Sequence, residues 1–367
     1  MEAPKTDSPP IEQMVAKLLQ AAVALRASDL HLRAGLPPFV RVDGALSRTN
    51  GGAVTAELLE EIIAVTSGRD PSGATVPQWE YSYESPGLVR LRGHVFREGG
   101  QWALALRVIP FSIPAFGDLR LPPVVKTLSE LGSGLVLVTG PTGSGKSTTM
   151  ASMLHHLASH DTVHLVSLED PVEFRIANVP SCISQREIGR DTPSLEEGLR
   201  ALLREDPDVI FISEIRDLAA LDVALQAAET GHSVYATFHT GTALKTLQRM
   251  IGMFPADEQV AARARLADSL RGVISQALLP RKGSRGRVLC TEVLVNNYSV
   301  KDCIRDPART PAIQAVLDRS TDQQMHAFDH CLASLVRDGL VAPDVALSHA
   351  VAPADFRRLL NFPGLQG

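Results

Sequence analysis

Eight consecutive residues have the types and spacing of a loop that holds a nucleoside triphosphate. They are Gly140, Pro141, Thr142, Gly143, Ser144, Gly145, Lys146 and Ser147, which fit the pattern of a glycine, four residues and then Gly-Lys-Ser. Glycines let backbone N–H groups turn inward around a phosphate, and the helix that follows adds a partial positive charge at its N-terminus. We expect Lys146 to reach the β- and γ-phosphates and the Ser147 hydroxyl to ligate Mg²⁺. With Thr148 in the first turn of that helix, the loop predicts a site for ATP and Mg²⁺.

Such a loop needs a strand before it and a helix after it, and the sequence supplies both. The apolar run Leu135 to Val138 predicts the strand, and a helical pattern begins at Lys146. Three more apolar runs, Val163 to Leu168, Val209 to Ile212 and Val234 to Phe238, alternate with helical stretches. Continuous apolar strands that alternate with helices indicate a parallel sheet buried on both faces. We therefore predict an α/β fold for this part of the chain.

Polar side chains follow the other three predicted strands, at the edge of a parallel sheet where ligands bind. Ser213 stands where P-loop ATPases usually have the aspartate that binds Mg²⁺, so we expect Glu214 to hold the metal through water. Glu169 is then the carboxylate that orients and deprotonates the attacking water. His239 is placed to contact the γ-phosphate.

Each of these side chains also has a simpler interpretation. Asp170 and Glu173, which flank Pro171 and Val172, could cap a turn. Glu169 could be a structural carboxylate, although a buried one is costly without a partner. His239 could be an ordinary core or turn histidine.

The composition describes a globular protein and argues against several functions. Of 367 residues, 44% are hydrophobic and 5% aromatic, and 36 basic against 41 acidic residues give a net charge of −5. Binding of nucleic acid usually needs a basic face with interleaved aromatic residues, so we expect none. No apolar stretch suggests a membrane span and no signal peptide is evident, so we predict a cytoplasmic protein. Four cysteines, Cys182, Cys290, Cys303 and Cys331, form no CxxC pair, so we expect free thiols and no zinc site.

The pattern of apolar residues changes along the chain and divides it into parts. After a flexible N-terminus (1–10), helical spacing over 11–25 and 58–65 and alternation over 29–32, 39–42, 89–96 and 102–108 predict a small α+β domain at 11–109. A segment rich in proline and glycine at 110–123 is the predicted hinge. The ATPase domain would span 124–300, and a helical region would span 301–367.

Several ordered motifs together resemble the secretion ATPase superfamily, which powers type IV pili, type II secretion and related machines. Residues 140–147 match its Walker A box, Ser167 to Glu173 its Asp box, Asp206 to Asp217 its atypical Walker B box, and Gly231 to Thr240 its His box. Gln185 to Gly189 is also family-like, as are Ser28 to Leu32 and Arg41 to Gly44 in the first domain. The resemblance covers roughly residues 10 to 300.

Within the superfamily, the short N-terminal region and the absence of a cysteine-rich zinc insert resemble the pilus retraction ATPases, the PilT-like branch. These also carry a C-terminal phrase, AIRNLIRE, which Ser299 to Asp306 matches only loosely. An accessory retraction motor, or a relative that serves another secretion or conjugation system, is therefore an alternative.

The resemblance implies a PAS-like first domain, a RecA-like second domain and a ring-shaped homo-hexamer that acts on an inner-membrane platform protein. The membrane would be reached only through that partner. It also implies that arginines of the first domain, at positions matching Arg92 and Arg107, complete the site on closure. Both could instead be a solvated face of a hairpin. Two further alternatives are a nucleic-acid motor and a scaffold that binds ATP without hydrolysing it.

Overall fold

The computed structural model describes residues 10–109, 111–177, 180–319 and 325–361. The predicted flexible N-terminus, apart from Pro10, and the first residue of the predicted hinge lie outside these ranges. The chain divides into two compact units, Met1–Ser112 and Ile113–Gly367, and the division falls inside the segment predicted as the hinge. That segment also contains a short helix, α3 (Phe116–Leu119), and the first residue of α4 (Pro123–Ser129).

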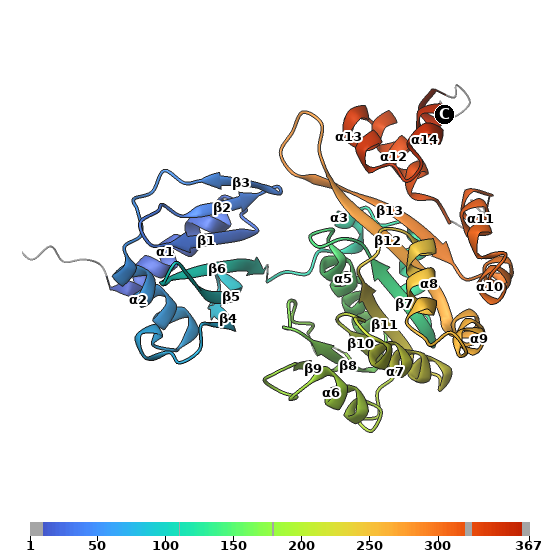
Figure 1. The fold of residues 1–367 in the computed structure, drawn as a ribbon, viewed down its shortest axis with the longest axis horizontal. Coiled ribbons are helices and arrows are strands. Elements are labelled where there is room, and N and C mark those ends of the chain that lie inside the picture. The colour runs from blue at the N-terminus through green and yellow to red at the C-terminus, as the bar shows by residue number, and fades with distance from the viewer. Residues whose placement is uncertain (1–9, 110, 178–179, 320–324, 362–367) are drawn as a thin grey trace, which may run out of the picture. The chain divides into compact units, whose positions relative to one another are not determined.

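The first unit is a six-stranded antiparallel sheet with two helices, drawn in blue to blue-green in Figure 1. Its strand order is β3-β2-β1-β6-β5-β4. The elements are α1 (Ile11–Ala24), β1 (Asp29–Arg33), β2 (Phe39–Val42), β3 (Ala45–Arg48), α2 (Ala56–Ser67), η1 (Pro71–Gly73), β4 (Gln78–Ser85), β5 (Val89–Glu98) and β6 (Gln101–Ile109).

Alternation along these strands separates an apolar face from a polar one. Leu30 and Leu32 are buried with residues of α1 and α2, whereas Asp29 and His31 face away from that core. Strands β3 and β4 are absent from the sequence prediction. β3 is exposed along its whole length, so it carries no apolar alternation that would reveal it. β4 (QWEYSYES) does alternate aromatic with polar residues, and the sequence prediction overlooks that pattern.

The second unit contains a seven-stranded sheet of order β13-β12-β7-β11-β10-β8-β9, which is parallel except for the β12–β13 pair. Its strands are β7 (Gly134–Thr139), β8 (His164–Glu169), β9 (Cys182–Glu187), β10 (Val209–Ile212), β11 (Ser233–Phe238), β12 (Leu270–Pro280) and β13 (Arg287–Val295). The predicted α/β fold with a preceding α+β domain is confirmed. The sequence prediction omits β9, β12 and β13, because β9 is largely polar and β12 follows a helix without a turn residue.

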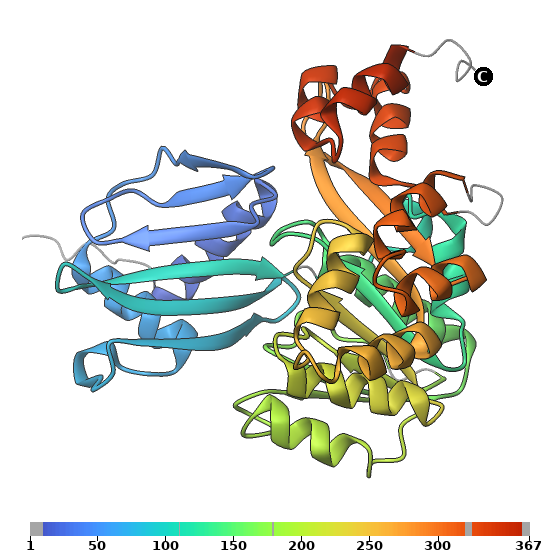
Figure 2. The same cartoon turned by 45° about the vertical axis from the view of Figure 1, so that its right-hand side comes forward.

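Successive residues of the central strands face opposite layers of helices, visible on either side of the sheet in Figure 2. Leu135, Leu137 and Phe238 pack with α7 (Leu218–Glu229) and its neighbours, while Val136, Val138 and Tyr235 pack with α4 and α5 (Lys146–His160). The remaining helices on the first side are α6 (Leu195–Leu202), α8 (Ala243–Gly252), α9 (Gln259–Ser269), α10 (Tyr298–Arg305) and α11 (Ile313–Arg319). Burial on both faces explains why these strands are continuously apolar.

The C-terminal part is helical, as predicted, and begins with α10 at Tyr298. After η2 (Thr310–Ala312) and α11 come α12 (Phe328–Arg337), α13 (Pro343–His349) and α14 (Pro353–Asn361). These last three helices share a small apolar core with the far ends of β12 and β13. Within the described ranges, no helix is both long enough and apolar enough to span a bilayer.

Candidate nucleotide-binding site

The predicted phosphate loop connects the end of β7 to the start of α5, and its glycines have the conformations that such a loop needs. Gly140, Gly143 and Gly145 all have positive φ, at 148°, 78° and 90°. A Cβ atom added to Gly140 would lie 2.3 Å from the Gln276 carbonyl oxygen, so no other residue fits there. A Cβ on Gly143 would meet nothing within 4 Å. The loop is therefore tight at its base and open at its tip.

Lys146 lies folded over this loop. Its side chain is largely buried, and Nζ donates to the carbonyl oxygens of Gly140 at 2.9 Å and Pro141 at 3.1 Å. Burial lowers the pKa of the Lys146 amine, and the carboxylates of Glu214 and Glu173 oppose that shift. The buried Ser144 hydroxyl has no hydrogen-bond partner among the described residues. A cradle with an open tip, a cation and a free hydroxyl fits a polyphosphate.

Strand β12 supports the loop from its other side. Gln276 Nε2 donates to the Ser144 carbonyl at 2.8 Å, and Thr139 Oγ1 donates to Ser275 Oγ at 2.9 Å. Gln276 is almost fully buried, so its amide holds the loop rather than a ligand. Sequence reasoning missed this residue, because β12 itself was not predicted.

The sheet order brings the predicted strand ends to one edge. β7, β11, β10 and β8 are successive neighbours, and Thr139 pairs with Phe238 while Ile212 pairs with both Ala236 and Leu168. The phosphate loop, His239, Glu214 and Glu169 therefore follow neighbouring strands at the same edge, as the sequence predicts.

Glu214 lies between the side chains of His239 and Arg216. His239 Nε2 lies 3.1 Å from Glu214 Oε1, and Arg216 Nε donates to Glu214 Oε2 at 2.8 Å. Arg216 also reaches Asp170 Oδ2 at 3.7 Å and so links the ends of β10 and β8. Arg216 carried no predicted role, although it lies only two residues after Glu214. Its partners show it to be part of the same charged group.

Glu169 ends β8 and is 6% exposed. Ser167 Oγ and Gln185 Nε2 donate to Glu169 Oε1 at 2.7 and 2.9 Å, and the Glu173 N–H also hydrogen-bonds to this carboxylate. Burial raises the pKa of Glu169 to about 7 despite these donors. Its carboxyl group thus holds the following turn in place, and little of it is accessible.

Glu173 has the opposite character. It is only half-buried, and its negative charge raises the pKa of Lys146 against the larger, lowering effect of burial. The sequence prediction treats Glu173 as a possible turn cap. That interpretation remains untested, and in the structure the charge of Glu173 also acts on the phosphate-binding lysine.

The metal site predicted at Ser147 and Glu214 has few protein ligands. No group of three or more histidine, cysteine, aspartate or glutamate side chains in the described segments could hold a metal ion. Ser147 lies in the first turn of α5 and is partly exposed. A hydroxyl with one carboxylate fits Mg²⁺, which takes much of its coordination from water and substrate phosphates.

Arg92 and Arg107 lie directly opposite each other on β5 and β6, on the polar face of the first unit's sheet. Arg92 donates to Glu80 Oε2 at 2.7 Å, and Arg107 Nε donates to Asp29 Oδ1 at 3.1 Å. The structure therefore brings the two predicted arginines together and gives each an acidic partner.

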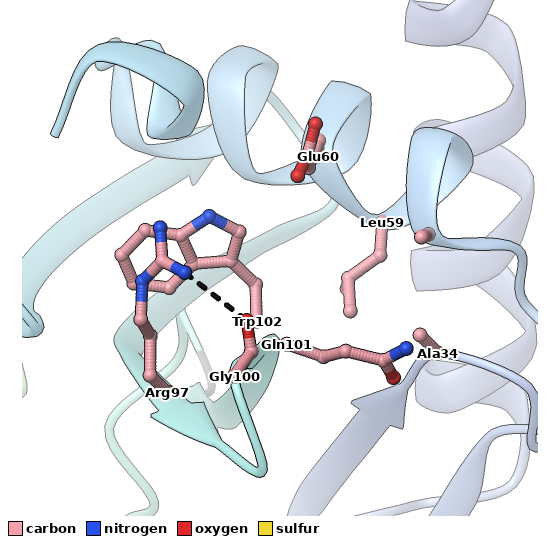
Figure 3. Close-up of a pocket in the computed structure, with 8 residues that line it drawn as sticks. Ala34, Leu59, Glu60, Arg97, Gly100, Gln101 and Trp102 are labelled. Atoms are coloured by element: carbon pink, nitrogen blue, oxygen red, sulfur yellow. Dashed lines mark hydrogen bonds between the residues drawn. The ribbon is translucent and has the colours of Figure 1, made fainter.

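A cavity of about 110 Å³ lies in the first unit between α2 and the β5–β6 hairpin (Figure 3). Arg97 lies over the Trp102 ring, with 4.1 Å from its guanidinium carbon to the ring centre, and donates to the Gly100 carbonyl at 3.1 Å. None of the predicted site residues lines this cavity. Its volume lies well below the roughly 300–1,000 Å³ of typical small-molecule sites, so it is too small for a nucleotide.

Comparison with known proteins identifies relatives along nearly the whole chain. Residues 123–336 match the family model described as type II/IV secretion system protein. The chain is 37% identical to the type IV pilus retraction ATPase PilT of Pseudomonas aeruginosa over 93% of its own length and 99% of that protein. It is 39% identical to a twitching motility protein of Neisseria gonorrhoeae over 85% of its length and 84% of that protein.

A solved structure shares the fold. The crystal structure of the pilus retraction motor PilT with bound ADP superposes with a TM-score of 0.82, at 39% sequence identity, over 93% of this chain and 98% of that one.

Proposed function

The chain belongs to the type II/IV secretion system protein family, and on that premise we propose that it is the motor ATPase that retracts a type IV pilus. It is an ATP-hydrolysing enzyme of the PilT-like branch. Retraction is supported by relatives that match most of the chain and are named for pilus retraction and twitching motility. The observation that carries the proposal is the phosphate loop with Lys146 beside Glu214, His239 and Glu173.

We assign ATP binding to the backbone and side chains of residues 140–148. Lys146 exchanges its bonds to the loop carbonyls for the β- and γ-phosphates, and Ser147 with Glu214 binds Mg²⁺, which neutralises charge on the phosphates. His239, paired with Glu214, contacts the γ-phosphate side of the site. Because Glu214 also binds Arg216, that arginine fixes the direction of the carboxylate.

The base that activates water is better assigned to Glu173 than to Glu169, the residue chosen from sequence. Three donors already occupy the buried Glu169 carboxylate, and one of them is the N–H of Glu173 itself. Glu173 is more exposed and its charge acts on Lys146. We therefore propose that Glu169 positions the turn and that Glu173 accepts the proton of the attacking water.

Two matched substitutions test this assignment. Glu173→Gln should leave ATP binding intact and lower kcat by about 10²-fold or more, as expected for loss of a general base. Glu169→Gln should lower kcat less and lower thermal stability, because Gln supplies fewer acceptors for three donors. Glu61→Gln, an exposed change in the first unit, is the control. Near wild-type turnover in Glu173→Gln together with a dead Glu169→Gln would return the base to Glu169.

We further propose that the protein works as a homo-hexamer at the cytoplasmic side of the inner membrane, where it acts on a platform protein. In this arrangement, Arg92 and Arg107 complete a nucleotide site on closure of the ring. Arg92→Ala and Arg107→Ala should then lower kcat at saturating ATP. Arg33→Ala, on the same sheet face and paired with Glu98, should not. Equal effects of all three would show that only the charge of this face matters.

A deletion strain tests the machine that is driven. Loss of retraction should leave cells with excess surface pili and no twitching motility. A related secretion or conjugation motor is the second candidate, since α10 departs from the retraction phrase at residues 299–306. Normal pili with a defect in secretion or DNA transfer would favour it. Tight, salt-dependent DNA binding by the purified protein would favour a nucleic-acid motor instead.

A further inference from the structure

Cys290 and Cys331 lie together where α12 covers the free edge of the seven-stranded sheet. β13 is the edge strand, and Cys290 on it is fully buried, whereas Cys331 on α12 is partly exposed. The Thr291 N–H donates to Cys331 Sγ at 3.4 Å. The Cys290 thiol donates to the Phe328 carbonyl oxygen at 3.8 Å and also interacts with the same sulfur. A backbone donor that would face open space on an edge strand is therefore satisfied by sulfur.

His326 completes the surroundings of Cys331. Its backbone pairs with Val293 of β13, and its Nε2 lies 3.0 Å from Thr291 Oγ1. A side-chain hydrogen bond also joins His326 to Cys331. The sulfur of Cys331 thus accepts a backbone N–H and interacts with an imidazole and a second thiol. Such an arrangement stabilises a thiolate.

The two thiols are polarised in opposite senses. The hydrogen bond from Cys290 lowers the pKa of Cys331 below its usual value, with help from His326 and Thr291 and against the effect of burial. Burial raises the pKa of Cys290, and the charges of Cys331, Asp329 and Glu292 raise it further. Cys331, the more exposed of the two, is therefore the thiol that ionises more readily.

We propose that Cys331 and Cys290 form a dithiol that a hydroperoxide oxidises to an intramolecular disulfide, with Cys331 as the reacting thiolate and Cys290 as the resolving thiol. In the first step an S–O bond forms at Cys331 as the O–O bond of the peroxide breaks, and the alkoxide or hydroxide that leaves takes a proton. In the second step Cys290 sulfur attacks Cys331 sulfur, the S–O bond breaks and water leaves. Two thiols lose two electrons, and one peroxide gains them.

The position of this dithiol connects it to the nucleotide site. Cys290 pairs with Ala277 on β12, and the preceding residue, Gln276, donates to the phosphate loop at Ser144. The disulfide would join α12 covalently to the strand next to β12. Most cytosolic thiols remain reduced, and those that do form disulfides are usually transient redox sensors.

Mass spectrometry of the full-length protein after hydrogen peroxide treatment tests the disulfide directly. Trypsin separates the cysteines into peptides 288–301 and 320–337, and we expect these to be joined in the wild-type protein and released by a reductant. Cys303→Ser removes another buried cysteine and should leave the joined peptides unchanged. In Cys290→Ser the resolving thiol is absent, so dimedone should label Cys331 as a sulfenic acid.

The pH dependence of alkylation tests which thiol reacts. The change in a thiol's alkylation rate with pH reports its ionisation and does not depend on how accessible the thiol is. At pH values below its pKa, a thiol reacts with iodoacetamide about tenfold faster for each unit by which the pH rises. A thiol that is already ionised shows no such increase in rate. We therefore expect the ratio of the Cys331 rate to the rate at the exposed Cys182 to fall by about tenfold or more from pH 6 to pH 8. A constant ratio would overturn the proposal, as would the absence of joined peptides in the wild-type protein or dimedone on Cys182 in preference to Cys331.

Discussion

Replacing Glu292 by Gln should change how the stability of the second unit depends on pH. Glu292 is fully buried on β13, where Oε1 accepts the N–H of Ala243 at 2.6 Å and Oε2 accepts the N–H of Phe328 at 3.4 Å. These residues begin α8 and α12, so one carboxylate joins two helix N-termini. Burial raises the pKa of Glu292 from 4.5 to about 7, and the two backbone donors and the charge of His326 oppose this rise.

The sign of the effect follows from the direction of that shift. The folded protein binds the Glu292 proton more tightly than the unfolded chain does, so this stabilisation is complete below pH 4.5 and is lost as pH rises through 7. A shift from 4.5 to about 7 corresponds to a total loss of about 3 kcal/mol. Between pH 6 and pH 8 the loss is about 1.3 kcal/mol, or roughly 3–5 °C in Tm for a unit of this size.

Thermal melts of wild type and Glu292→Gln from pH 6 to pH 8 measure this contribution. The wild-type Tm should fall more steeply with pH than the Tm of Glu292→Gln, by about the 3–5 °C above. The absolute Tm of the variant is not the test, since the amide also faces a backbone donor with its NH₂ group. Glu258→Gln, at an exposed carboxylate, should keep the wild-type slope. Equal slopes for wild type and Glu292→Gln would refute the assignment of a raised pKa to this group.

Three further changes have expected outcomes that follow from contacts in the second unit. Gly140→Ala should abolish nucleotide binding by calorimetry, because its Cβ would collide with the Gln276 carbonyl, while Gly132→Ala, with nothing within 4 Å, should bind normally. Gln276→Ala removes the donor to the Ser144 carbonyl and should weaken ADP binding about three- to tenfold, the value of one hydrogen bond; unchanged affinity would mean that β12 does not hold the loop. Glu169→Gln should also flatten the fall in stability between pH 6 and pH 8, since burial raises the pKa of Glu169 to about 7 as well; a slope equal to wild type would contradict this.

The sequence predicts the parts of the fold in which burial or backbone conformation restricts the residue type at each position. Strands buried on both faces must be apolar throughout, so β7, β8, β10 and β11 were found within a residue or two of their bounds. The phosphate loop is found for a similar reason, because glycines with positive φ at Gly140 and Gly145 allow no substitute. Edge strands carry weaker constraints. β3, β4, β9 and β13 are all edges, and each was missed.

Missing β12 and the edge strand β13 also concealed the residues they carry. Gln276 and Glu292 are polar side chains that read as surface residues in an unassigned segment, yet both are buried and bonded to backbone groups of distant segments. Cys290 and Cys331 are 41 positions apart and follow no recognised spacing, so their pairing depends on α12 folding back over β13. Contacts of this kind are set by tertiary packing, and no local pattern in the chain encodes them.

The choice between Glu169 and Glu173 shows why a strand end alone does not identify a catalytic carboxylate. A side chain at the end of a central strand lies at the sheet edge, but neighbouring strands also enclose it. Glu169 illustrates this, since it is 6% exposed and bonded to Ser167 and Gln185. The turn that follows is less enclosed, and its N–H groups can be held by that same buried carboxylate. Burial of Glu169 and accessibility of Glu173 are thus two consequences of one turn. A base must meet water and the γ-phosphate together, so the residue that the turn presents, and not the residue that anchors it, meets the chemical requirement.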